Sequence, residues 1–281
     1  MWGVENFRPL RLKKFLYLCK LIMTVSFKKY HCLGRDFILL DNRNGEFETL
    51  QSAEIARLCA RRFGIGASGV LRLDQCSETL IVVKSFNFNG MLAELNISDA
   101  SCVAVFAKDL GFLTDSTNIK INEQIVCCDI GSNHENMHFV NVQIPDSIAI
   151  KKAVKGFVMD YGTPFCMVPV DDVSLVDVVE KGREISYSKR FPKGANITFY
   201  QQNQGFLEIR HYEHQVDQET YTNGLCVIGA ALSHAQHSED DSCLVRTQSG
   251  EIRVSFERAE HSFFNVKLLV LVNAVYDGTT I

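Results

Sequence analysis

The order of hydrophobic and polar positions along the chain predicts many short strands. Nine apolar segments of three to five residues alternate with polar positions or run continuously, and glycine, asparagine and aspartate separate them. We expect strands at 37–40, 70–73, 80–83, 138–142, 157–159, 197–200, 206–209, 252–256 and 267–271.

Two segments between these strands have the spacing of amphipathic helices. The first helix is capped by Ser52 and stops at Gly64, and the second covers 172–181 and stops at Gly182. The apolar face of the first helix is formed by Ile55, Leu58, Cys59 and Phe63. Helices interleaved with strands in this way indicate the α+β class.

Two further helical segments, at 100–110 and 225–234, are apolar on nearly every face. A helix that is hydrophobic all round is normally buried, so each should form the centre of its own half of the molecule. The sequence therefore predicts two pseudo-symmetric halves, each a curved, mostly antiparallel sheet around a central helix. Pro145 and the polar residues near Asp146 mark the expected joint.

These patterns divide the chain into three parts. We expect an N-terminal extension over 1–23, a first half over 24–145 and a second half over 146–271. The apolar run at 15–19 is too short to span a bilayer, and Lys20 interrupts it. The pattern favours a dispensable extension, with Met23 as the functional start, over a peripheral basic helix or a secretion signal.

Composition narrows the classes of partner. The chain has 281 residues and 46% hydrophobic content, and 29 lysines and arginines against 33 acidic residues give a net charge of −4. This balance argues against nucleic-acid or membrane-surface partners. Ten cysteines without a CxxC pair indicate neither a disulfide scaffold nor a zinc ribbon, and they suit a reduced, cytoplasmic compartment.

Five separated motifs follow one another in an order that resembles the diaminopimelate epimerase family. They are KYHCLGRDFI at 29–38, RRFGIGASGV at 61–70, FNFNG at 86–90, FPKGANI at 191–197 and YEHQV at 212–216 followed by Glu219 and Thr220. The resemblance runs from about residue 25 to the end. It implies two similar halves that close over a small amino-acid substrate, with the last strand, 272–281, returning to the first half. It also implies an isomerase activity in lysine and peptidoglycan precursor biosynthesis. A homodimer is a separate expectation.

The resemblance also implies a mechanism without metal or cofactor. Two cysteines of the family face each other across the substrate, and one removes the α-proton while the other delivers a proton to the opposite face. Each thiol lies just before a central helix, where the N–H groups and the helix dipole lower a thiol pKa and bind the substrate carboxylate. By this resemblance we expect an amino-acid-like ligand in the cleft between the halves, and we expect no cofactor.

This chain departs from the family at both thiol positions. Asn96 aligns with the first cysteine, in a Cys-Gly-Asn-Gly turn, and Asn223 aligns with the second, in Cys-Gly-Thr-Gly. An amide does not ionise near neutral pH, so it cannot act as the general acid or base. We therefore expect a catalytically inactive homologue that keeps an interdomain ligand cleft.

Several binding positions differ as well. Arg35 and His214 stand where the family has asparagine and arginine, and Phe165 replaces a histidine. Asp99 places a carboxylate in the first turn of the central helix, where it would repel the family substrate. The expected substrate-binding residues are Asn87, Asn196, Glu213, His214 and Arg35.

Two alternatives keep catalysis in the same cleft. An isomerase of altered chemistry could use other acid and base groups, namely Asp99, Glu213, His214 and Asp217. A replacement thiol could restore the family reaction, with Cys226 one helical turn beyond Asn223. Each surviving binding residue also has a structural interpretation, since asparagine often satisfies turn backbone and glutamate often pairs with a cation. The spacing of the histidines does not make a convincing metal site, so none is expected.

Overall fold

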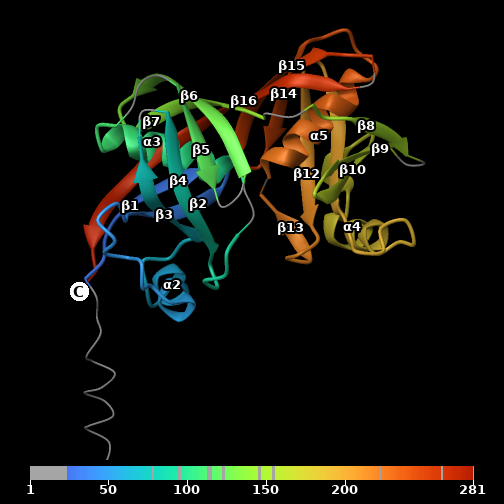
Figure 1. The fold of residues 1–281 in the computed structure, drawn as a ribbon. Coiled ribbons are helices and arrows are strands. Elements are labelled where there is room, and N and C mark those ends of the chain that lie inside the picture. The colour runs from blue at the N-terminus through green and yellow to red at the C-terminus, as the bar shows by residue number, and fades with distance from the viewer. Residues whose placement is uncertain are drawn as a thin grey trace, which may run out of the picture.

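A computed structural model describes residues 24–77, 79–93, 96–112, 116–121, 124–144, 147–153, 156–221, 223–260 and 262–280. The extension expected over 1–23 and the joint expected at Pro145 and Asp146 lie outside these residues. The described strands form one 16-stranded sheet that passes through two lobes (Figure 1). No helix in the described ranges is long and apolar enough to cross a membrane.

The first lobe is a closed ring of strands around one helix. Its strands are β1 (Ser26–Cys32), β2 (Arg35–Asp41), β3 (Gly69–Cys76), β4 (Leu80–Asn87), β5 (Ser116–Ile121), β6 (Gln124–His134) and β7 (Met137–Gln143). Strand β16 (Phe263–Thr279) closes the ring because it pairs with both β7 and β1. Helix α3 (Ile97–Asp109) runs through the middle, and α2 (Ser52–Cys59) packs outside.

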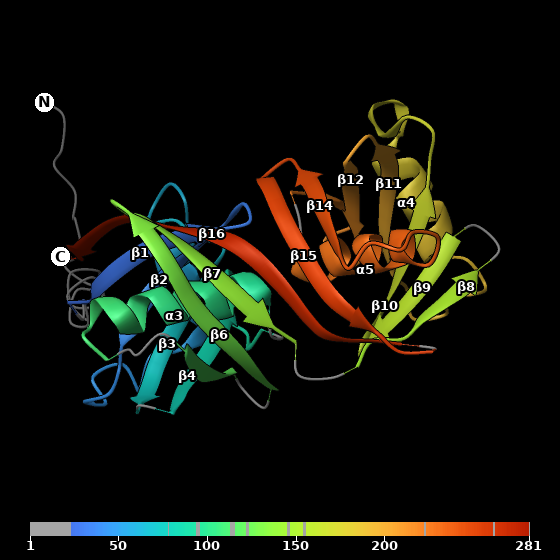
Figure 2. The ribbon, with the colours of Figure 1, turned by 90° about the horizontal axis from the view of Figure 1, so that it is seen from above.

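The second lobe is an open, curved sheet around its own helix, as Figure 2 shows from above. Its strands are β8 (Ile150–Ala153), β9 (Gly156–Tyr161), β10 (Thr163–Pro169), β11 (Asn196–Asn203), β12 (Phe206–Glu213), β13 (Gln218–Thr220), β14 (Ser242–Thr247) and β15 (Gly250–Arg258). Helix α5 (Gly224–Ala235) lies in the concave face, while the short η1 (Val173–Leu175) and α4 (Val178–Ser186) lie outside.

The two lobes repeat the same order of elements. In the first, α2 links the parallel strands β2 and β3, and α3 links the parallel strands β4 and β5. In the second, α4 links the parallel strands β10 and β11, and α5 follows β13 and precedes β14, which runs parallel to β12. The remaining pairs are antiparallel. The predicted α+β fold of two pseudo-symmetric halves, each a mostly antiparallel sheet around a central helix, is confirmed.

The central helices are buried for the reason the sequence suggests. Every residue of α3 from Ile97 to Ala107 is buried, and so are most residues of α5. Their small side chains, alanine, serine, cysteine and glycine, let strands approach on all sides. Both helices pack into one hydrophobic core that continues from one lobe into the other.

The outer helices differ in detail from their predictions. Helix α2 begins after Gln51, whose N–H donates to the Glu54 carboxylate at 2.8 Å, so Ser52 is the first helical residue and not the cap. Phe63 lies beyond the end of α2 and is 88% exposed, so its place on the buried face was predicted wrongly.

The helix expected over 172–181 was also placed wrongly. The segment forms η1 and then α4, which continues to Ser186. Gly182 lies inside α4. The side chain of Tyr212 packs against it, and a β-carbon at Gly182 would lie 2.5 Å from Tyr212 Cβ. Its glycine therefore serves close packing and does not end the helix.

Candidate functional site

Helix α3 begins at Asn96, which caps its N-terminus. Asn96 has an extended backbone, and its Oδ1 accepts hydrogen bonds from the Ser98 N–H at 3.2 Å and the Ser98 hydroxyl at 2.9 Å. The side chain is buried. Asn96 therefore supplies the acceptor that a helix N-terminus requires.

Asp99 lies in the first turn of the same helix and is completely buried. The Ser85 hydroxyl donates to its Oδ2 at 2.8 Å. Burial raises the pKa of Asp99, although the charge of Arg35 and the hydrogen bond from Ser85 act in the opposite direction. A carboxyl group of the chain itself thus occupies the interior beside this helix N-terminus.

Helix α5 begins in the same way at Asn223. Its Oδ1 accepts from the Leu225 N–H at 2.9 Å. The thiol of Cys226 donates to the Asn223 carbonyl at 2.8 Å, and the Asn223 N–H points back to the sulfur at 3.3 Å. Cys226 is therefore folded back onto the backbone of the cap.

The two helix N-termini meet at the side chain of Ile97, which is not among the expected site residues. Ile97, the first residue of α3, packs directly on Gly224, the first residue of α5. Ile97 is 2% exposed and belongs to the core shared by both lobes. By the family resemblance, Ile97 falls at the first glycine of the Cys-Gly-Asn-Gly turn, which marks the position in the sequence but not its contact with Gly224.

Asn196 and His214 lie together in the second lobe. Asn196 Oδ1 accepts from the backbone N–H of His214 at 3.0 Å. The ring of His214 covers Gly194, and its Nδ1 is 3.1 Å from the Ser186 hydroxyl. The ring of Tyr187 packs beside it, with 5.0 Å between centroids. Asn196 thus holds the backbone of His214, as the structural interpretation of this residue expects.

Glu213 precedes His214 at the end of β12 and is half-buried. Its backbone carbonyl accepts from the Val216 and Asp217 N–H groups at 3.2 and 2.9 Å, which turns the chain towards β13. The position of its side chain therefore depends on a tight turn directly after His214.

Asn87 and Arg35 occupy turns of the first lobe. Asn87 Oδ1 accepts from the N–H groups of Asn89 and Met91 at 3.2 and 3.1 Å, which closes the turn after β4. Arg35 follows the β1–β2 turn, and its guanidinium lies 5.4 Å from the centroid of Phe37. Its charge acts on Asp99.

Phe165, which by the resemblance stands at a histidine position of the family, is an apolar core residue. It lies on β10 beside Asn196 of β11, is buried, and belongs to the shared core. A phenyl ring can neither donate nor accept a conventional hydrogen bond there.

The alternative acid and base groups belong to separate networks. Asp99 is bonded to Ser85 inside the first lobe, whereas Asp217 pairs with Arg183 at 2.9 Å and accepts from the Tyr212 hydroxyl at 2.5 Å. The hydrogen bonds from Arg183 and Tyr212 lower the pKa of Asp217. Asp217 is therefore a surface ion-pair partner in the second lobe.

The thiols near the first helix are unsuited to proton abstraction. Burial raises the pKa of Cys32 and of Cys102, the latter well above its ordinary range. Both groups are consequently neutral thiols at physiological pH. Within the described ranges, no group of three or more histidine, cysteine, aspartate or glutamate side chains is placed to hold a metal ion.

These features define a class of protein with an epimerase-like architecture. The N-termini of the two buried helices meet between two repeated lobes, and an asparagine caps each helix. A phenazine biosynthesis protein of the PhzF family from Bacillus anthracis shares this fold, with a TM-score of 0.67 and 15% identity over 92% of this chain and 100% of that one.

Sequence comparison identifies the family within this class. The family model for diaminopimelate epimerase matches residues 157–269. The diaminopimelate epimerase of Methanocella arvoryzae is 31% identical over 252 residues, which cover 83% of this chain and 90% of the relative. That of Flavobacterium psychrophilum is 27% identical over 255 residues, covering 89% of this chain and 98% of the relative. The chain belongs to the diaminopimelate epimerase family.

Proposed function

We propose that this protein is a non-catalytic member of the diaminopimelate epimerase family, in which the two-thiol proton relay has been lost. The observation that carries the proposal is the state of the two helix N-termini. Asn96 and Asn223 each accept a hydrogen bond from a helix N–H two residues ahead. An amide in this arrangement is a structural cap, and it does not ionise near neutral pH, so it can neither take up nor deliver the α-proton as a base or acid.

The groups around the caps support the same conclusion. Asp99 places a buried carboxyl group in the first turn of α3, where an anionic ligand would meet like charge if that carboxyl were ionised. Cys226, the thiol closest in sequence to Asn223, is hydrogen-bonded to the cap carbonyl. Neither group replaces the pair of opposed thiols that the family resemblance implies.

Solvent deuterium exchange tests the proposal directly. Purified protein is incubated in D₂O with diaminopimelate, and incorporation at the α-carbon is followed by NMR. The Methanocella arvoryzae relative serves as a positive control. We expect no incorporation above the protein-free background, because both groups that should move the α-proton are amides.

A second variant asks whether the thiols alone were lost. The double variant Asn96→Cys with Asn223→Cys restores both family residues, yet we expect it to remain inactive. Ile97, Asp99 and Phe165 still alter the space and polarity around the site, so complementarity to the transition state is not recovered.

Turnover would overturn the proposal, and its origin could be traced. Exchange by the parent protein that disappears in Cys226→Ser would favour a replacement thiol. Exchange that survives Cys226→Ser would favour an isomerase that uses the other acid and base groups. Recovery of the relative's rate in the double asparagine variant would show that Ile97, Asp99 and Phe165 do not block the reaction.

A further inference from the structure

The contact between Ile97 and Gly224 closes the space between the two helix N-termini. A β-carbon at Gly224 would lie 2.5 Å from Cδ1, 2.7 Å from Cβ and 3.0 Å from Cγ1 of Ile97. Such separations are shorter than ordinary van der Waals contact, so only glycine fits beneath Ile97. The backbone of Gly224 is not in the left-handed region. Glycine is therefore needed at this position because a side chain would clash with Ile97, and not because of its backbone dihedral angles.

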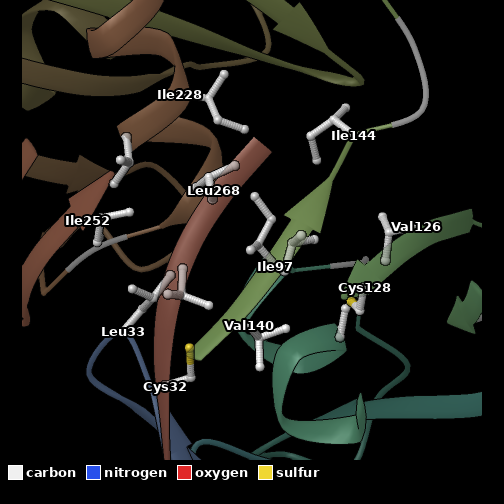
Figure 3. Packing of buried hydrophobic residues seen from close by; sticks show 14 of the residues in the cluster. Cys32, Leu33, Ile97, Val126, Cys128, Val140, Ile144, Ile228, Ile252 and Leu268 are labelled. Atoms are coloured by element: carbon white, nitrogen blue, oxygen red, sulfur yellow. The ribbon is translucent and has the colours of Figure 1, made fainter. Parts of the chain in front are cut away.

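Ile97 lies in the hydrophobic core that both lobes share. Figure 3 draws it together with Ile144 from the end of the first lobe, Leu268 of the shared strand β16 and Ile228 of α5. Ile97 is the first helical residue of α3, so its backbone is also fixed by the Asn96 cap. A β-branched side chain with few rotamers is well suited to keep one position in such a core.

A second contact holds the lobes at another point. The β1–β2 turn of the first lobe reaches the second lobe, where a β-carbon at Gly34 would lie 2.9 Å from Tyr221 Cβ and 2.6 Å from Ser249 Oγ. Gly34 and the preceding Leu33 both have positive φ values, which builds the tight turn that allows this approach. Strand β16 meanwhile pairs with strands of both lobes.

We propose that Ile97 is an internal plug, which seats on Gly224 and keeps the space between the lobes permanently shut against amino-acid ligands. This inference rests on the proposed function for its meaning, since it explains how a non-catalytic member excludes the ligand class of its family. It replaces the expectation that an open ligand cleft persists between the two lobes. Ile97 thus lies between the two helix N-termini, where the family resemblance implies that an amino-acid substrate is bound.

A double-mutant cycle measures the contact. The variants are Gly224→Ala, Ile97→Gly and the combination, with unfolding followed by chemical denaturation. Gly224→Ala should be strongly destabilising in the parent, because the new methyl group meets Ile97. In the Ile97→Gly background that clash is absent, so the unfolding constant should change roughly tenfold less on adding Gly224→Ala.

Gly229→Ala is the matched control on the same helix. A β-carbon at Gly229 would lie 2.7 Å from Met167 Sδ and does not involve Ile97. Its cost should be the same in the parent and in the Ile97→Gly background, because the two sites share no partner. Equal costs for Gly224→Ala in both backgrounds would overturn the plug.

Hydrogen exchange supplies a measurement that does not depend on Gly224→Ala folding. Ile97→Gly should accelerate exchange of the backbone amides in the first turn of α5 by an order of magnitude or more, while α4, which is remote from the contact, should serve as an unchanged reference. Exchange in α5 that is the same in the parent and in Ile97→Gly would refute the proposal.

Neither measurement involves turnover. Coupling between Ile97 and Gly224 together with deuterium incorporation by the parent would leave the closing contact but overturn the non-catalytic function. Absence of both coupling and incorporation would overturn the plug and leave the proposed function standing.

Discussion

A buried histidine should make this protein sensitive to mild acid. His211 lies on β12 with 1% of its surface exposed, and its Nδ1 is 3.2 Å from the Thr198 hydroxyl. Its Nε2 has no hydrogen-bond partner among the described residues. Burial lowers the pKa of His211 from 6.5 to about 4. The folded protein therefore binds the proton of this ring far less readily than the unfolded chain does.

The sign and size of the effect follow from this difference. Well above pH 6.5 the ring is neutral in both states and the full stability is present. As the pH falls towards 4, the unfolded chain takes up the proton first, and stability is lost. A pKa difference from about 6.5 to about 4 corresponds to a total loss of about 3 kcal/mol, of which about 2 kcal/mol falls between about pH 7 and pH 5.

The assay is urea denaturation of the parent and of His211→Gln at several pH values between about 7 and 5. The lower limit avoids most carboxylate titration in the unfolded chain. Burial also lowers the pKa of His138, so the parent should lose stability through more than one ring. The difference in slope between the parent and His211→Gln isolates His211.

Thr198→Val provides the matched control. It removes the hydroxyl beside Nδ1 and keeps the ring, so it should lower stability at every pH while preserving the slope. If His211→Gln retains the slope of the parent, His211 does not titrate in this range and the reasoning from its burial fails.

Two further predictions concern the helix N-termini. Asn223→Ala removes the acceptor of the Leu225 N–H and should lower the free energy of unfolding by about 1 kcal/mol. Asn223→Ser keeps a capping oxygen and should retain most of the parent's stability. Equal stability of the alanine variant and the parent in urea would contradict the capping role of Asn223. The raised pKa of Asp99 means that its neutral carboxyl stabilises the folded parent at low pH, and that this stability is lost as the carboxyl ionises. The free energy of unfolding of Asp99→Asn should therefore rise relative to that of the parent as the pH increases from about 4 to 8. A difference between these two proteins that does not change with pH would show that Asp99 does not ionise in the folded state over that range.

The sequence alone was sufficient for the architecture. A helix without a polar face, as at 100–110 and 225–234, can be stable only when strands surround it, and two such helices in one chain require two similar lobes. The structure confirms both helices as α3 and α5, each within three residues of its expected bounds. Periodicity also located all nine expected strands, because alternation of apolar and polar positions is a local property of the chain.

Helix ends needed the tertiary structure. The pattern placed the start of the first central helix at residue 100, whereas α3 begins directly after Asn96. Gly182 looked like a stop signal, yet Tyr212 packs on it in the interior of α4. A glycine that ends a helix and a glycine that admits a neighbouring ring are identical in sequence, and only the neighbour distinguishes them.

At the candidate site, too, some features follow from the sequence and others only from the tertiary structure. The amides Asn96 and Asn223 could be recognised from residue identity once the family motifs were compared with this sequence, and they carry the hypothesis that the two thiols are absent. What fills the space between them could not, because it depends on two residues more than a hundred positions apart. Ile97 seats on Gly224 only after both lobes have folded around their helices and β16 has joined them. Shape complementarity between distant segments is a property of packing, and no local pattern in the chain encodes it.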